Sequence, residues 1–157
     1  MKSQSGFTLV EILIVVVILG ILAAIVIPQF TSASTEAKES ALVSDLQAMR
    51  SQIELYKIHH NDQLPGTVSG VDFATAMTSK TNQAGEVGTT ALHRFGPYMR
   101  NVPSNPFNDL NTVELDGTAG DDSAGWNFVT AAGVSQGLFQ PDDDDTNQVS
   151  GDAHTTY

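Results

Sequence analysis

The 157-residue sequence contains no cysteine, and basic residues are scarce. Without cysteine, the chain cannot form a disulfide framework, a cysteine-based zinc site or a thiol nucleophile. Seven lysines and arginines stand against 18 acidic residues, which gives a formal net charge of −11. Because a nucleic-acid-binding protein needs the opposite sign of charge, we expect no nucleic-acid partner. Apolar residues make up 41% of the chain, which argues against a disordered protein.

Sequence patterns of enzymes are also missing. The sequence has no H-E-x-x-H zinc motif, no G-x-S-x-G nucleophile motif and no G-x-x-x-x-G-K-[ST] phosphate loop. Two of the four histidines, His59 and His60, are adjacent, and adjacent residues of a helix do not share a face. We therefore assign no catalytic residue and expect a protein without enzymatic activity.

The apolar residues are concentrated in one run near the N-terminus. Residues 7–27 read FTLVEILIVVVILGILAAIVI, with Thr8 and Glu11 as the only polar side chains. A helix of this length spans roughly 30 Å, the thickness of a bilayer's hydrocarbon core. The alternative is a secretory signal peptide, but its apolar region is usually about 7–15 residues long and ends in a small-x-small cleavage site. This run is longer and ends in Ile-Val-Ile-Pro, so we predict a transmembrane helix over residues 7–28.

The residues in front of this run carry a resemblance. The sequence Gly6-Phe7-Thr8-Leu9-Val10-Glu11, the apolar run and Pro28 resemble the class III leader of type IV pilins and type II secretion pseudopilins. The resemblance implies that residues 1–6 are a prepilin leader, which a prepilin peptidase removes by cutting between Gly6 and Phe7. It also implies N-methylation of Phe7. Lys2 fits a cytoplasmic N-terminus by the positive-inside rule.

Glu11 is the acid that this family keeps as the fifth residue of the processed chain. A carboxylate in an apolar helix costs about 2.5–3.5 kcal/mol at the bilayer centre, so Glu11 needs a partner. Cleavage exposes an α-amine at Phe7, and Glu11 of one subunit can pair with that amine in a neighbour. Such a pair would set the axial register of an assembly. The alternative is that Glu11 only extends to the lipid headgroups.

A second helix pattern follows the apolar run. Its apolar and aromatic positions recur at steps of four and three, which is typical of one helix face; they are Leu42, Leu46, Met49, Ile53, Tyr56 and His60. We predict an amphipathic helix over residues 29–61, continuous with the transmembrane segment. Gly20 and Pro28 are the predicted positions of a kink.

Residues 62–157 contain 11 of the 13 glycines and 5 of the 6 prolines, which indicates short elements joined by turns. We predict a short helix over residues 71–77 and three antiparallel strands at 112–115, 126–130 and 137–140, the last two forming a hairpin. Residues 142–156 are acidic and polar and are predicted to form a mobile tail. The expected fold is α+β: a long N-terminal helix packed on a small antiparallel sheet with long loops.

The resemblance extends into this second half. Gly96-Pro97-Tyr98-Met99, leading to Pro103-Ser104-Asn105-Pro106-Phe107, is similar to the loop that precedes the sheet of major pseudopilins. Together with the missing C-terminal cysteine pair, this loop favours a type II secretion pseudopilin with a pilin-like fold. The alternative is the major pilin of a type IV pilus, a fibre for adhesion, motility or DNA uptake.

The pseudopilin resemblance implies a location and a set of partners. The precursor would cross the bacterial inner membrane once, with a cytoplasmic N-terminus and a periplasmic head. It would leave the membrane lipid for a homo-oligomeric helical filament. An assembly ATPase, an inner-membrane platform protein and minor pseudopilins are the expected partners in that step.

Acidic clusters in the second half raise the question of a metal. Major pseudopilins bind calcium in the loops of their sheet, and clustered acids suit that ion. One cluster here is Asp116, Asp121 and Asp122, and the other is the run 142–145. Neither matches the EF-hand spacing. We assign no cofactor and no metal ligand: calcium and solvated acidic loops both remain open.

Overall fold

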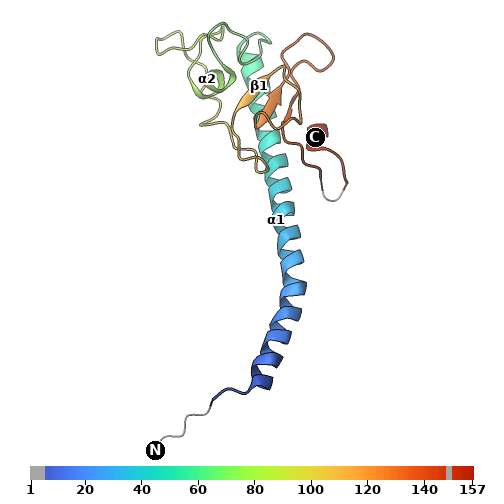
Figure 1. The fold of residues 1–157 in the computed structure, drawn as a ribbon. Coiled ribbons are helices and arrows are strands. Elements are labelled where there is room, and N and C mark those ends of the chain that lie inside the picture. Colours follow the sequence, from blue (N-terminus) through green and yellow to red (C-terminus); the bar gives the residue numbers. More distant parts are fainter. Residues whose placement is uncertain (1–5, 148–149) are drawn as a thin grey trace, which may run out of the picture. The chain divides into compact units, whose positions relative to one another are not determined.

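The computed structural model describes residues 6–147 and 150–157. The chain divides into two compact units, residues 1–37 and residues 38–157. Helix α1, Leu9–His59, is a single 51-residue helix that contributes to both units (Figure 1). The predicted continuity of the apolar and amphipathic segments is therefore confirmed. The helix continues through Gly20 and Pro28 without a break, and a kink at these positions stays a prediction.

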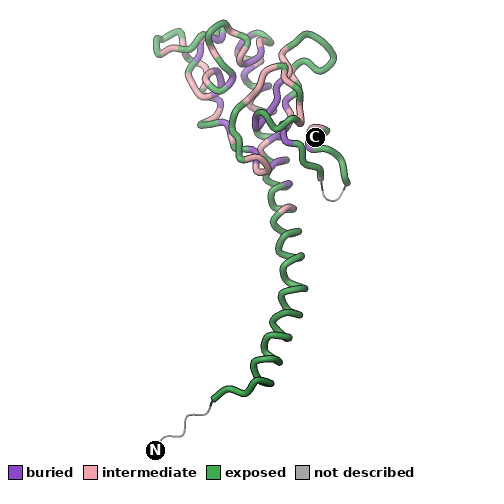
Figure 2. Tube along the Cα trace, viewed as in Figure 1, coloured by how far each residue is buried: buried purple, intermediate pink, exposed green. Residues whose placement is uncertain are grey.

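In the second unit, which we call the head, one face of α1 forms one side of the hydrophobic core. Five predicted positions of this face are 0–2% exposed: Leu42, Leu46, Met49, Ile53 and Tyr56. Aromatic side chains from the rest of the head pack with them, including Phe73, Trp126, Phe128 and Phe139. The amphipathic pattern thus identified the helix face that the head covers (Figure 2).

Helix α2, Phe73–Thr78, confirms the short helix predicted over residues 71–77. Asp72 caps its N-terminus, because its carboxylate accepts a hydrogen bond of 2.7 Å from the Thr75 N–H. Phe73, Ala76 and Met77 are the buried face of α2. The ring of Phe73 meets that of Phe128 edge-to-face, with centroids 5.2 Å apart.

The sheet has three strands in the order β1 (Val113–Leu115), β2 (Trp126–Phe128) and β3 (Phe139–Pro141). β2 and β3 are antiparallel, as predicted. The prediction was wrong for β1, which pairs with β2 in parallel. The reason lies in the intervening loop, which returns the chain to the start of β1 before β2 begins: the N–H groups of Gly125 and Trp126 both donate to the Thr112 carbonyl at 3.1 Å.

Gly125 is the residue that makes this return possible. A Cβ atom at this position would lie 2.1 Å from the carbonyl oxygen of Leu110. Only glycine therefore allows the two backbone segments to come so close. The loop also contains Asp116 and Asp122 with φ angles of 57° and 63°, in the left-handed region that aspartate tolerates better than most residues.

The prediction of a mobile acidic tail over residues 142–156 is wrong, because the described residues of this segment form part of the head. Asp142, Asp143 and His154 are 0–2% exposed. Thr146 pairs with Ala153, and a short 3-10 helix, η1, covers His154–Thr156. The buried carboxylates have hydrogen-bond partners from distant parts of the chain, which a local count of charges cannot reveal.

Candidate functional site

The predicted cleavage site lies directly in front of α1. Gly6 is exposed and Phe7 is 79% exposed, and α1 begins two residues later at Leu9. A backbone segment that is both exposed and outside the helix is accessible to a peptidase. Residues 1–5 of the predicted leader, with Lys2 among them, lie outside the described residues.

Glu11 has a local role that we did not predict. Its N–H donates to the Thr8 hydroxyl at 3.3 Å, and its carboxylate accepts a long hydrogen bond of 3.5 Å from the Thr8 N–H. This reciprocal arrangement is a capping box, and its T-x-x-E spacing was visible in the sequence. Glu11 is exposed, and the capping places its carboxylate at the end of α1 that carries Phe7.

The first unit presents an apolar surface without cover. Seventeen large apolar side chains between Phe7 and Phe30 are 49–82% exposed. Among the described residues, α1 is the one helix long and apolar enough to span a membrane, and none of its apolar window is buried (Figure 2). A soluble monomer rarely leaves such a large apolar surface exposed, so this surface is a site for lipid or for other protein chains.

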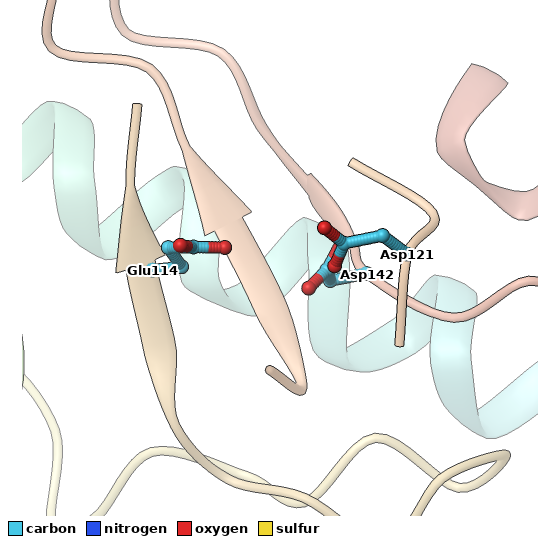
Figure 3. Close-up of side chains that lie close together, drawn as sticks. All are labelled: Glu114, Asp121 and Asp142. Carbon is cyan, nitrogen blue, oxygen red and sulfur yellow. The ribbon is translucent and has the colours of Figure 1, made fainter. Parts of the chain in front are cut away.

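In the head, three carboxylates converge. Oxygen atoms of Glu114, Asp121 and Asp142 all lie within 4.8 Å of one another. Glu114 comes from β1, Asp121 from the loop before β2, and Asp142 directly follows β3 (Figure 3). Asp121 is exposed, whereas Asp142 is buried and accepts hydrogen bonds from the N–H groups of Gly120 (2.7 Å) and Ala124 (2.9 Å).

The sequence predicted this cluster only in part. The structure takes Asp121 and Asp142 from the two predicted acidic clusters and adds Glu114, which the sequence did not single out. Asp116 instead closes the turn after β1, where hydrogen bonds from the Thr130 hydroxyl and the Ala131 N–H hold the pKa of its carboxyl below the usual range. Parallel pairing of β1 with β2 brings Glu114 to the loop, and a sequence pattern cannot show this.

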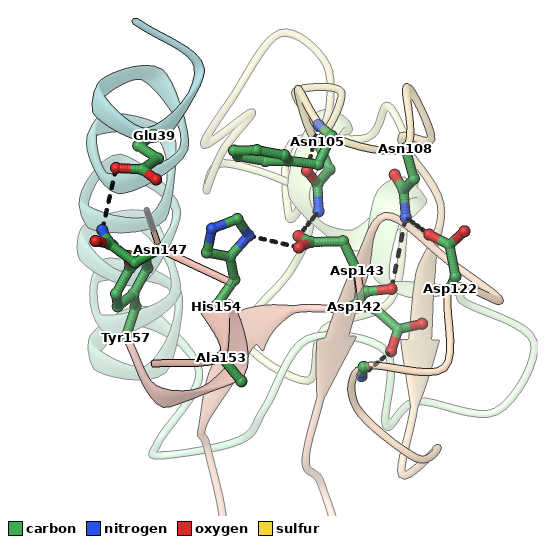
Figure 4. Close-up of polar contacts among 12 residues, drawn as sticks. Glu39, Asn105, Asn108, Asp122, Asp142, Asp143, Asn147, Ala153, His154 and Tyr157 are labelled. Carbon is green, nitrogen blue, oxygen red and sulfur yellow. Dashed lines mark hydrogen bonds and ion pairs between the residues drawn. The ribbon is translucent and has the colours of Figure 1, made fainter. Parts of the chain in front are cut away.

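A buried polar network holds the C-terminal segment. The Asp143 carboxylate lies 2.5 Å from His154 Nδ1 and accepts a hydrogen bond of 2.6 Å from the Asn105 side chain (Figure 4). Asp143 and His154 are 2% and 0% exposed, so solvent and substrates do not reach this pair. Asn147 donates to the Glu39 carboxylate of α1 at 3.1 Å and ties the same segment to the helix.

Comparisons with known proteins agree with these features. A family model described as the prokaryotic N-terminal methylation motif matches residues 1–27. This match defines the class of the chain: proteins that carry an N-terminal methylation motif ahead of an apolar helix. No solved structure matches the chain at a significant level.

Relatives that align with most of the chain identify the family within this class. The type II secretion system core protein G of Aeromonas hydrophila is 34% identical over 143 residues, which cover 81% of this chain and 95% of that protein. The protein of the same name from Pseudomonas aeruginosa is 35% identical over 119 residues, 76% of this chain and 79% of that protein. This chain belongs to the family of type II secretion system core protein G. A fimbrial protein of Pseudomonas aeruginosa is 34% identical over 125 residues, 78% of this chain and 73% of that protein. Because core protein G of several organisms matches the chain, the pilin alternative is less well supported.

Proposed function

We propose that this chain is the repeating structural subunit of a pseudopilus, the helical filament of a type II secretion system. The observation that carries the proposal is the division of the chain into a head with its own core and a helix whose apolar surface has no cover. A soluble enzyme or a soluble monomeric binding protein has no use for such a surface. A subunit that moves from a bilayer into a filament needs it in both places.

The same apolar surface serves before and after assembly. In the precursor it is dissolved in lipid, with the head in the periplasm and the N-terminus in the cytoplasm. In the filament it packs against the α1 helices of other subunits. Lipid tails and packed apolar helices are similarly apolar, so the transfer between them costs little. Withdrawing the subunit from the membrane still requires work, and we assign this step to a cytoplasmic assembly ATPase and an inner-membrane platform protein, with minor pseudopilins as further partners.

Processing at Gly6–Phe7 prepares the subunit for assembly. Removal of residues 1–6 by a prepilin peptidase creates an α-amine at Phe7, and methylation of this amine keeps its positive charge. The Glu11 carboxylate already faces the N–H of Thr8, the residue next to this amine. Glu11 of one subunit then pairs with the Phe7 amine of a neighbour, which fixes the axial register.

We also propose that Glu114, Asp121 and Asp142 hold a calcium ion. Among the described residues, none of the three forms an ion pair with a lysine, arginine or histidine. Three negative groups within 4.8 Å of one another repel, and a hard cation with oxygen ligands removes the repulsion. The ion would join β1, the loop before β2 and the segment after β3.

Calcium is expected to raise the melting temperature of the purified chain and EDTA to lower it, whereas an Asp121→Asn variant is expected to respond to neither.

The processing step provides the test of the proposed function. Intact-mass measurement of the protein extracted from membranes is expected to show the loss of residues 1–6 and the gain of one methyl group. Fibres sheared from cells that overproduce the chain are expected to contain this processed form. A mature chain that starts near Thr31 would identify an ordinary signal peptide and would refute the proposal.

A further inference from the structure

The charges of the chain are separated along the sequence. All seven lysines and arginines lie before residue 101, whereas 8 of the 18 acidic residues lie before it and 10 after it. Along the sequence, the head therefore has a segment with several cations, up to residue 100, and a segment without any after it. Because the whole chain carries a net charge of −11, identical heads that pack closely repel one another unless a cationic surface meets an acidic one.

Three cations of the head are exposed and without carboxylate partners among the described residues. We call Lys80, Arg94 and Arg100 the basic patch: all three are exposed, and none forms an ion pair among the described residues. Thr81 and Phe95 exchange two backbone hydrogen bonds of 3.0 and 3.1 Å in an antiparallel bridge, so Lys80 and Arg94 flank this bridge diagonally, one on each side of it. The guanidinium of Arg94 is held over the Phe95 ring, 5.4 Å from its centroid.

Two hollows open beside these cations. Arg100 lines a hollow of about 520 Å³ between α2 and the start of β1. Arg94 lines a second one of about 360 Å³, together with Leu92, which is 73% exposed. A cation beside an open hollow is suited to receive an acidic segment of another molecule, because the segment finds both an opposite charge and space.

The matching acidic segment lies in the same head. Asp144 and Asp145 are exposed, and neither forms an ion pair among the described residues. The backbone around them is anchored: the preceding Asp142 donates its N–H to the Gly125 carbonyl at 3.1 Å, and the Asp145 carbonyl accepts a hydrogen bond of 3.2 Å from His154. Two free carboxylates on an anchored backbone can dock with little loss of conformational entropy.

The basic patch and this acidic segment cannot meet within one subunit. Residues 80–100 and residues 142–146 lie on opposite sides of the head (Figure 1). A contact between two different surfaces of identical subunits is heterologous, and its repetition generates a helical filament wherever the rotation does not close into a ring. We propose that Asp144 and Asp145 of one head dock onto the basic patch of a neighbouring copy. This inference rests on the proposed filament function and adds the head-to-head contact to it.

Thiol cross-linking of the full-length chain tests the contact directly, because the natural chain has no cysteine. Arg100→Cys and Asp144→Cys chains are produced together in the same membranes and treated with a short bismaleimide. We expect a cross-linked dimer from the mixture and none from either chain alone. As a control for position, Ser135→Cys, in the exposed loop before β3, replaces Asp144→Cys and is expected to give no dimer. Absence of the dimer while sheared fibres still form would overturn the inference.

Charge exchange tests whether the contact supports assembly. Arg100→Glu places like charges opposite each other, and we expect the yield of sheared fibres to fall about tenfold. Asp144→Lys is expected to give the same loss, and the double variant to restore the yield. Arg100→Glu combined with Glu36→Lys has the same net charge as the double variant and is expected to restore nothing.

The two proposals fail in different ways. Unchanged fibre yield in Arg100→Glu and Asp144→Lys overturns the head-to-head contact but leaves the filament function intact. Absence of fibres from the unaltered chain refutes the filament function itself. Amounts of processed protein in the membrane report whether each variant folds, and Arg94→Glu repeats the test at a second cation of the patch.

Discussion

Replacement of Phe139 tests whether the core of the head is assembled as described. The Phe139 side chain is 0% exposed and lies among three other rings, with centroid distances of 5.5 Å to Trp126, 5.7 Å to Phe73 and 6.1 Å to Phe128. Phe139→Ala leaves a cavity between α2 and the sheet. Truncation of a buried phenylalanine costs about 3–5 kcal/mol, a large part of the roughly 5–15 kcal/mol that stabilises a typical domain.

Thermal unfolding of the full chain in detergent gives the measurement, followed by the fluorescence of the single tryptophan, Trp126. One kcal/mol corresponds to roughly 4 °C in a head of this size, so we expect the melting temperature to fall by about 12–20 °C. The neighbouring Leu138 is 38% exposed, and Leu138→Ala serves as the matched control with a far smaller expected shift. Equal shifts for the two variants would refute the placement of Phe139 at the centre of the core.

Three further perturbations have defined outcomes. Glu11→Gln is expected to leave cleavage intact but to abolish fibres. Thr8→Ala removes only the capping partner of Glu11 and is expected to retain fibres. Loss of fibres in both variants would assign Glu11 to capping alone. Gly125→Ala drives a Cβ against the Leu110 carbonyl and is expected to destabilise the head by about 3 kcal/mol in urea unfolding; unchanged stability would contradict the close approach. Burial lowers the pKa of His60 in the folded head, so as the pH falls through the ordinary histidine pKa of about 6.5 the unfolded chain binds more protons than the folded one. The free energy of unfolding is therefore expected to fall from pH 7.5 to pH 5.5, and to fall less steeply in His60→Gln. An equal slope in the two proteins would refute this assignment.

Features encoded by local spacing could be predicted from the sequence. The buried face of α1 follows from a repeat of apolar residues every three or four positions, and the extent of the apolar segment follows from its length. Gly6, Phe7 and Glu11 could be named as candidates because they form one contiguous motif, and their roles stay a prediction. The capping of α1 by Thr8 was equally local, and the T-x-x-E motif would have sufficed to predict it.

Features that depend on distant residues could not be predicted. A strand sequence carries no direction, so the parallel pairing of β1 depends on how the following loop returns at Gly125. The carboxylate cluster depends on the same pairing, which is why Glu114 was missed. The burial of Asp143 requires His154 and Asn105, residues 11 and 38 positions away, and a count of nearby charges indicated a solvated tail instead.

The continuity of α1 has a mechanical consequence for the head. The apolar segment, which we propose is withdrawn from the membrane, belongs to the same helix as the residues on which the core of the head packs. A pull along this helix loads the buried contacts of Leu42, Leu46, Met49, Ile53 and Tyr56 together, in shear, and not one after another. Because all five contacts must slip at once, the head resists tension along the helix axis more strongly than tension that peels a strand from its sheet.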